Sequence, residues 1–325
     1  MNRAISPGWV TVLIVIATLG SAGAAQVTLF PAADTSLWQR QPANNLGGMP
    51  FLPAGTTGDD GPFTRSRLLI RFDVAATLPA NAVIDSASIY FRVVRAPDPA
   101  KGNNNSEFNA HRVLKPWGEG TKSFTDPQVP MTSTQPATAG ETTWLHRFHG
   151  ASASAWTPPG GDFTDDDFAE AASFAFFALA GADRDYTADL NETGLQDVRD
   201  WLADPGSNHG WVLRSLSENF GFTARQFASR EYADNPAHRP QLTIVYSLPQ
   251  PVPPQIQSIN RNGNQLTIRF SAQAGVVYRP QRRAAVHSGA WTDLPAVGPL
   301  ATAGTLSFVD DVTGQSERYY RVVTP

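Results

Sequence analysis

The sequence contains no cysteine and little lysine, and outside its first residues it has no apolar run long enough to span a membrane. Without cysteine no disulfide can form, so stability must come from a hydrophobic core and strand pairing. Lysine occurs only at positions 101, 115 and 122. The positive charge is therefore mostly planar guanidinium, which suits carboxylates and aromatic faces. A formal net charge of −4 gives no support to a nucleic-acid partner.

Residues 1–25 have the pattern of a secretory signal peptide. Arg3 supplies the positive start, residues 10–17 are mostly apolar, and residues 22–25 offer a small-residue cleavage site. The apolar run is far shorter than the ~20 residues of a spanning helix, although a retained N-terminal anchor is the alternative. We expect an exported chain, extracellular or at the cell surface, that begins near Gln26. The full chain has a formal charge of −4, and loss of Arg3 with the signal peptide would change it to −5.

Strict alternation of apolar and polar residues indicates half-buried strands. In residues 66–74, SRLLIRFDV, one side carries Leu68, Ile70, Phe72 and Val74, and the other carries Arg67, Leu69, Arg71 and Asp73. The same two-sided pattern returns at 89–94, 211–215 and 242–246. Proline and glycine number 26 each and fall between these runs. The sequence therefore predicts an all-β fold, with one large jelly-roll-type β-sandwich over residues 26–247.

Further elements follow from local patterns. We expect strands at 27–30, 83–95 and 110–114, with 83–95 paired to 66–74 in the core. Residues 38–60 read as a long turn region, and 97–106 as a polar loop. A short helix is predicted at 193–202, capped by Asn191 or Thr193. Residues 165–180 allow either a helix or a buried strand, because short apolar runs do not settle the period.

A proline-rich spacer separates a second, smaller unit. Residues 248–255, LPQPVPPQ, contain four prolines and favour an extended, semi-rigid linker. Residues 256–325 then alternate in short runs, with strands expected at 264–271, 276–281, 305–309 and 318–323. A unit of this size and pattern predicts a small immunoglobulin-like or fibronectin-like β-sandwich.

Several segments, in this order, resemble the DNRLRE domain: SRLLIRFDV, LPANAVIDSASIYFRV, HRVLKPWGEG, TTWLHRFHG with WTPPGGDF, HGWVLRS, and ASREY with HRPQLTIVYS. The resemblance covers most of the mature chain, from about Gln26 to Ser247. It implies a jelly-roll-type sandwich in exported or surface proteins, and some related modules bind polysaccharides, including uronate polymers such as alginate. It implies no catalytic set. YRPQRR, WTDLP, FVDD and RYYRVV resemble the small β-domain that often closes secreted bacterial proteins.

The outward half of the strands offers a candidate binding face. If the apolar residues point inward, five groups point outward: Arg67, Arg71, Tyr90, Arg92 and Arg214. On neighbouring strands they would bind an acidic glycan, because guanidinium forks match carboxylates and a tyrosine ring stacks on sugars. The alternative is that these arginines pair with Asp73, Glu231 or other acids on a solvated face. Trp38 and Trp117, expected in loops, are further candidates for sugar stacking.

No catalytic arrangement is recognisable. The six histidines are scattered, and His146 and His149 lack a third metal ligand nearby. No cofactor is expected, although a structural calcium is possible. Its candidate ligands are Asp162, Asp165, Asp166 and Asp167, with Asp59 and Asp60 elsewhere, but their spacing is not that of an EF-hand, and a solvated acidic turn is the alternative. The preferred hypothesis is a non-catalytic polysaccharide-binding module. A structural surface or matrix protein and an unrecognised polysaccharide-active enzyme remain the alternatives.

Overall fold

A computed structural model describes residues 24–58, 64–97, 102–152, 154–249, 252–285 and 289–324. The chain forms two compact units, of which one ends at Leu248 and the other begins at Pro249. Four predictions fall wholly or partly outside the described residues: the signal peptide up to residue 23, the Asp59–Asp60 pair, positions 98–101 of the polar loop, and positions 250 and 251 of the linker. In the described ranges, no helix has both the length and the apolar character needed to cross a membrane.

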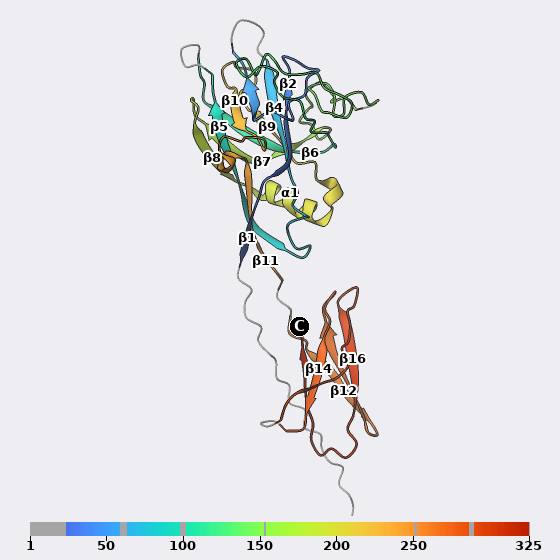
Figure 1. Ribbon diagram of the computed structural model, residues 1–325. Coiled ribbons are helices and arrows are strands. Elements are labelled where there is room, and N and C mark those ends of the chain that lie inside the picture. Colours follow the sequence, from blue (N-terminus) through green and yellow to red (C-terminus); the bar gives the residue numbers. More distant parts are fainter. Residues whose placement is uncertain are drawn as a thin grey trace, which may run out of the picture. The chain divides into compact units, whose positions relative to one another are not determined.

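The first unit is a curled antiparallel sheet that closes into a sandwich (Figure 1). Its strands follow the order β1-β11-β5-β10-β3-β4-β9-β6-β7, with β2 on β4 and β8 on β5. The bounds are β1 Ala25–Leu29, β2 Pro31–Trp38, β3 Phe51–Thr56, β4 Arg65–Phe72, β5 Val83–Arg95, β6 Ser106–Val113, β7 Phe168–Ala178, β8 Arg184–Asp189, β9 Trp211–Ser215, β10 Arg225–Ala228 and β11 Gln241–Ser247. The predicted all-β sandwich class is confirmed.

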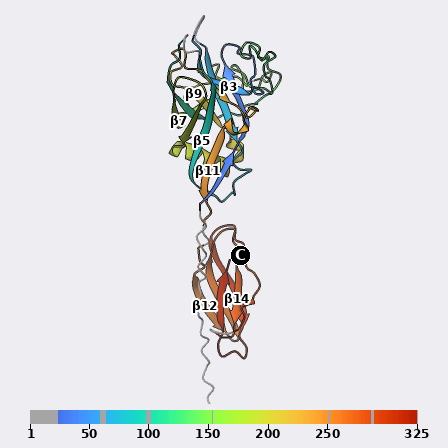
Figure 2. The same ribbon diagram turned by 60° about the vertical axis from the view of Figure 1, so that its left-hand side comes forward.

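The core lies between two layers, with β5 in one and β7 in the other (Figure 2). The ring of Phe91 on β5 lies 6.3 Å from that of Phe174 and 5.8 Å from that of Phe176, both on β7. Leu68 and Ile70 belong to the same buried cluster, so the inward side of β4 is as predicted. The predicted pairing of β4 with β5 is wrong, because β4 pairs with β2, β3 and β9, whereas β5 pairs with β8, β10 and β11.

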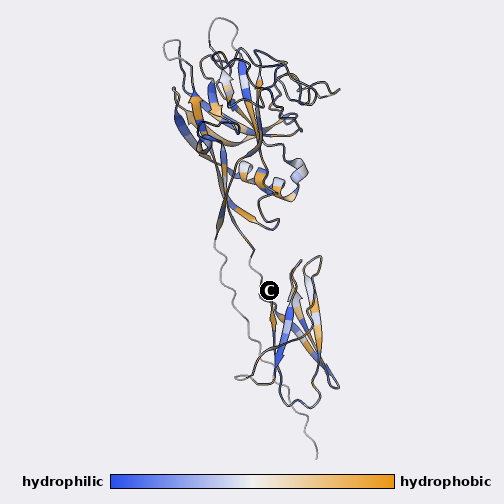
Figure 3. Cartoon of the chain, in the orientation of Figure 1, coloured by the Kyte–Doolittle hydropathy of each residue, from blue (hydrophilic) through white to orange (hydrophobic). Residues whose placement is uncertain are grey.

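Helix α1, Glu192–Ala203, packs on β7 and β5. Its N-cap is Asn191, whose side chain accepts a hydrogen bond from the Gly194 backbone N–H at 3.0 Å. Buried Asp197 accepts from Ser173 at 2.6 Å and from the Trp211 indole at 2.8 Å, which ties the helix to the sheet. Both the predicted helix and one of its two predicted caps are confirmed. Figure 3 shows hydrophobic and hydrophilic residues alternating along α1 and the strands.

Two stretches depart from local propensity. Most of residues 165–180, from Phe168 to Ala178, form strand β7, because alternate residues near its end, among them Phe174, Phe176 and Ala178, are buried in the core. The predicted turn region 38–60 is wrong in its later part, where every residue of β3 is buried. Pro53 and Gly55 lower the strand propensity of β3. Pairing with β10 and β4 in the core outweighs that preference.

A long irregular segment, residues 114–167, covers the outer side of β4 and β9. Leu69 and Val212 point to that side and are fully buried in a second apolar cluster with Trp117, Trp144 and Trp156. We call this covered outer side of β4, β9 and β6 the covered face. Trp117, Trp144 and Trp156 therefore pack this covering segment against the sheet.

The second unit consists of two three-stranded antiparallel sheets, β12-β13-β16 and β15-β14-β17. Leu266, Ile268 and Phe270 form its core with Tyr278 and Phe308. The bounds are β12 Ile256–Asn262, β13 Gln265–Ala272, β14 Arg279–Arg283, β15 Thr292–Asp293, β16 Gly304–Asp311 and β17 Tyr319–Val323. Each of the four predicted strand regions overlaps an observed strand, so the small sandwich is confirmed.

Candidate functional site

The five predicted outward groups do not form one face. Arg67, Arg71 and Arg214 lie on β4 and β9, which pair directly, whereas Tyr90 and Arg92 lie on β5 in the opposite layer. Since both layers direct their apolar residues into the same core, the two groups point away from each other. The expectation of a common face is therefore wrong. Strand adjacency had been inferred from chain order, and the curled sheet separates β4 from β5 by β3 and β10.

Arg67 is a buried structural arginine, with only 6% of its surface exposed. Its Nε and Nη2 donate to the two carboxylate oxygens of Glu218 at 2.9 and 2.8 Å. Its Nη1 donates to the carbonyls of Gly160 and Gly161, and the guanidinium lies 4.8 Å from the Phe163 ring centroid. Each of its nitrogens thus has a protein acceptor, which leaves none for a ligand.

Arg71 and Arg214 also pack on aromatic rings of the covering segment. The Arg71 guanidinium lies 5.7 Å from the Trp117 ring, and that of Arg214 lies 3.7 Å from the Phe163 ring. Trp117 is in a loop, as predicted, but it is buried and donates its indole N–H to the His209 carbonyl at 2.8 Å. These contacts hold the covering segment on the sheet.

His111 on β6 belongs to the same covered face. Its ring lies 4.8 Å from that of Phe163, and its Nδ1 is 3.0 Å from the Ala169 carbonyl oxygen. Burial, and then the nearby charge of Arg214, lower the pKa of His111 to about 4. The imidazole is therefore neutral at neutral pH, which fits packing under the covering segment.

On the opposite layer, Tyr90 and Arg92 are partly exposed but engaged with acids. The Tyr90 hydroxyl donates to Asp185 at 2.7 Å, and Arg92 donates to Asp185 at 3.1 Å and to Asp183 at 3.4 Å. Burial and the Asp185 hydrogen bond raise the pKa of Tyr90 to about 12. Arg92 therefore fits the alternative expectation, in which the arginine pairs with acids on a solvated face, better than the expectation of a free ligand-binding group.

A hollow of about 520 Å³ opens beside β3, β5 and β10. Cross-strand register places Gln226 of β10 between Pro53 of β3 and Arg95 of β5. Trp38, at the end of β2, is among the lining residues although it is nearly fully buried. The expectation that Trp38 lies in a loop is wrong, yet this candidate does lie at a cavity. The other lining residues are Arg40, Thr57, Gly58, Ser66, Val94, Ala96, Pro97, Met131, Ala182, Phe222 and Ala224.

The described residues that line the hollow carry charge of one sign only. Arg40 and Arg95 are both exposed, and no acidic residue stands among the described residues that line it. The Arg95 guanidinium lies 5.0 Å from the centroid of the Phe51 ring. The side-chain oxygen of Gln226 is buried and has no hydrogen-bond partner among the described residues. The lining therefore combines apolar surface with two cations and an unused polar group, and its volume is that of an ordinary ligand site.

Each of the four aspartates proposed for calcium has a protein partner. Asp162 accepts from the Thr164 hydroxyl, Asp166 pairs with Lys115 at 2.6 Å, and buried Asp167 accepts from the Thr157 backbone. Asp165 accepts from the Glu170 backbone N–H at 2.8 Å. In the part of the chain that is described, their oxygens do not converge on one point. The acidic-turn alternative fits this geometry.

Sequence reasoning missed Arg40, Arg95 and Gln226. Arg95 ends a predicted strand and follows Val94, so the alternation could have placed it at a sheet rim. Gln226 gave no such indication because β10, which carries it, was not predicted, and Arg40 lies in a turn after β2 without any pattern of its own. No protein-family model matches the chain, and no curated protein matches it significantly.

Proposed function

We propose that the chain is an exported, non-catalytic module that binds an acidic polysaccharide, with the hollow lined by Arg40, Arg95 and Gln226 as its binding site. The observation that carries this proposal is the composition of the lining. Two exposed guanidinium groups lie beside apolar residues, and the described lining residues include no acid. Guanidinium groups bind carboxylates in a bidentate geometry. A polymer with one carboxylate per sugar unit presents such groups at regular spacing.

Binding rather than hydrolysis is favoured by the chemistry of the lining. Glycoside hydrolysis needs two carboxyl groups across the scissile bond, and the described lining supplies none. The resemblance of the first unit to the DNRLRE domain supports the same class of ligand.

The experiment compares retention of the purified chain in gels that contain a polyuronate or a neutral glucan. We expect retention by the polyuronate that weakens as salt rises, because the contacts are charged and partly exposed. Polymer length is followed in the same samples and should stay constant. Equal migration in both gels, or retention only by the neutral polymer, would contradict the proposal, and shortened polymer would replace it with an enzymatic role.

A further inference from the structure

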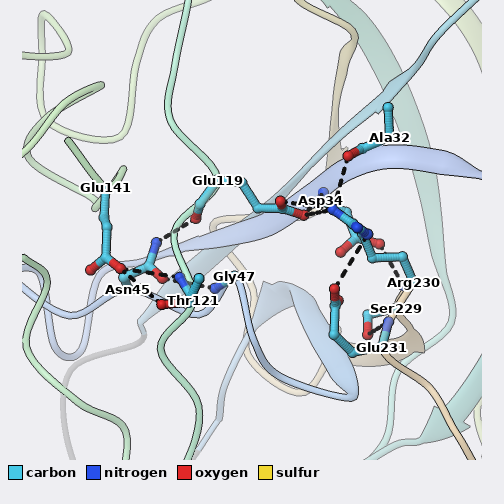
Figure 4. A network of polar contacts seen from close by, with 10 residues as sticks. All are labelled: Ala32, Asp34, Asn45, Gly47, Glu119, Thr121, Glu141, Ser229, Arg230 and Glu231. Carbon is cyan, nitrogen blue, oxygen red and sulfur yellow. Dashed lines mark hydrogen bonds and ion pairs between the residues drawn. The ribbon is translucent and has the colours of Figure 1, made fainter.

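A second polar cluster lies away from the hollow, where three segments distant in sequence meet (Figure 4). Asp34 comes from β2, Glu119 from the covering segment, and Glu231 from the turn after β10. One carboxylate oxygen from each lies within 4.8 Å of the others. Figure 4 shows the three side chains directed toward one another beside the Arg230 guanidinium.

The protein's own donors satisfy only part of this cluster. Glu119 accepts from the Asp34 backbone N–H at 2.8 Å and from Arg230 Nη1 at 2.9 and 2.8 Å. Asp34 Oδ2 accepts from the Arg230 backbone N–H at 2.8 Å. Asp34 Oδ1 and Glu231 Oε2, however, are buried and have no hydrogen-bond partner among the described residues.

The cluster has an excess of negative charge that a further cation would balance. Three carboxylates and one guanidinium carry a formal charge of −2, and Asp34 is only 1% exposed. Burial, and then the charge of Glu231, raise the pKa of Asp34 well above its usual range. A buried carboxylate oxygen without a partner is costly, so it either takes a proton or binds a cation.

We propose that Asp34, Glu119 and Glu231 bind one calcium ion, with Asp34 Oδ1 and Glu231 Oε2 as ligands. All donors are hard oxygens, and one divalent ion balances the formal charge of −2. Calcium accepts irregular oxygen arrangements and completes its shell with water, whereas magnesium demands a near-ideal octahedron. The site would link β2, the covering segment and the turn after β10, at positions where the backbone is already closely packed.

That close packing is visible next to Glu119. Asn45 donates to the Glu119 carbonyl at 2.7 Å and accepts from the Gly47 and Lys122 backbones. A Cβ on Gly47 would lie 2.3 Å from the Glu119 carbonyl oxygen, so only glycine permits this approach. The backbone that carries Glu119 is therefore fixed before any ion binds, which lowers the cost of forming the site.

The test is calcium titration of the purified chain by calorimetry, with thermal unfolding in calcium, in magnesium and in chelator. We expect one calcium per chain and a rise of about 5 °C in the unfolding midpoint of the first unit at saturating calcium. Asp34→Asn should fold without calcium, since the amide imitates a protonated carboxyl, and should lose the calcium response. Glu231→Gln should lose it as well, and serves if Asp34→Asn fails to fold. Asp162→Asn, from the other acidic turn, should keep it.

Three outcomes would overturn the proposal. If the parent neither binds calcium nor shows a shift of its unfolding midpoint, Asp34 Oδ1 and Glu231 Oε2 share a proton instead of a calcium ion. Loss of the response in Asp162→Asn with retention in Asp34→Asn would place calcium in the other turn. An equal response to magnesium would contradict the assignment to calcium. None of these results depends on glycan binding, so the two proposals fail separately.

Discussion

Two regions of the first unit differ in what happens to their arginines. On the covered face, Arg67 is enclosed by Glu218, two carbonyls and aromatic rings. Beside β3, β5 and β10, Arg40 and Arg95 remain exposed at a hollow. The same residue type therefore stabilises a covering segment in one region and stays accessible to a ligand in the other.

The difference between these regions shows which structural properties the alternation of apolar and polar residues in a strand predicts. A period of two tells which residues share a side of a strand. It does not tell whether another segment covers that side. On the predicted outer sides, Leu69 and Val212 were the residues that indicated a cover, because without one these apolar side chains would be exposed to solvent.

The largest effect should come from breaking the buried pair on the covered face. Arg67→Met leaves Glu218 buried and uncompensated, and we expect the first unit to lose about 3–5 kcal/mol of unfolding free energy. Arg71→Met, four residues along the same strand and only partly buried, is the matched control and should cost about 1 kcal/mol or less. Urea unfolding measures both. Equal losses for the two variants would mean that Arg67 is not structurally special.

A smaller effect should appear in the pH dependence of the covered face. The folded pKa of His111 is lowered, so its contribution to stability is present above about pH 6.5 and is lost as the pH falls toward 4. Over that window we expect the parent to lose on the order of 2–3 kcal/mol through this group. His111→Gln should lose correspondingly less between pH 7 and pH 4.5 in urea unfolding. An unchanged pH dependence in the variant would contradict the depressed pKa.

Much of the fold could be predicted from the sequence. Strands β5 and β9 were predicted at their observed bounds, and α1 with its Asn191 cap to within one residue at each end, because periodicity and capping are local properties. Strand β3 could not be predicted, since Pro53 and Gly55 argue against a strand and only its partners in the core override them. The spacing of apolar residues in 165–180 allowed either a helix or a strand. The packing of Phe174 and Phe176 on Phe91 in the core favours the strand.

The candidate site was less accessible to such reasoning, because it depends on which strands are neighbours. Tyr90 and Arg92 were placed with Arg67 on the assumption that β4 and β5 pair, and the curled sheet separates them. The Asp34 cluster joins residues 34, 119 and 231, which no local pattern connects.

The central claim is that accessible arginines at the hollow, and not those of the predicted face, bind an acidic glycan. The most direct measurement is the affinity of a polyuronate oligosaccharide for the parent, for Arg40→Ala/Arg95→Ala, and for Arg71→Ala/Arg92→Ala, which removes the same charge. We expect the first double variant to bind about tenfold or more weakly, roughly 1.4 kcal/mol, and the second to bind like the parent. The reverse order, or equal weakening in both, would contradict the account.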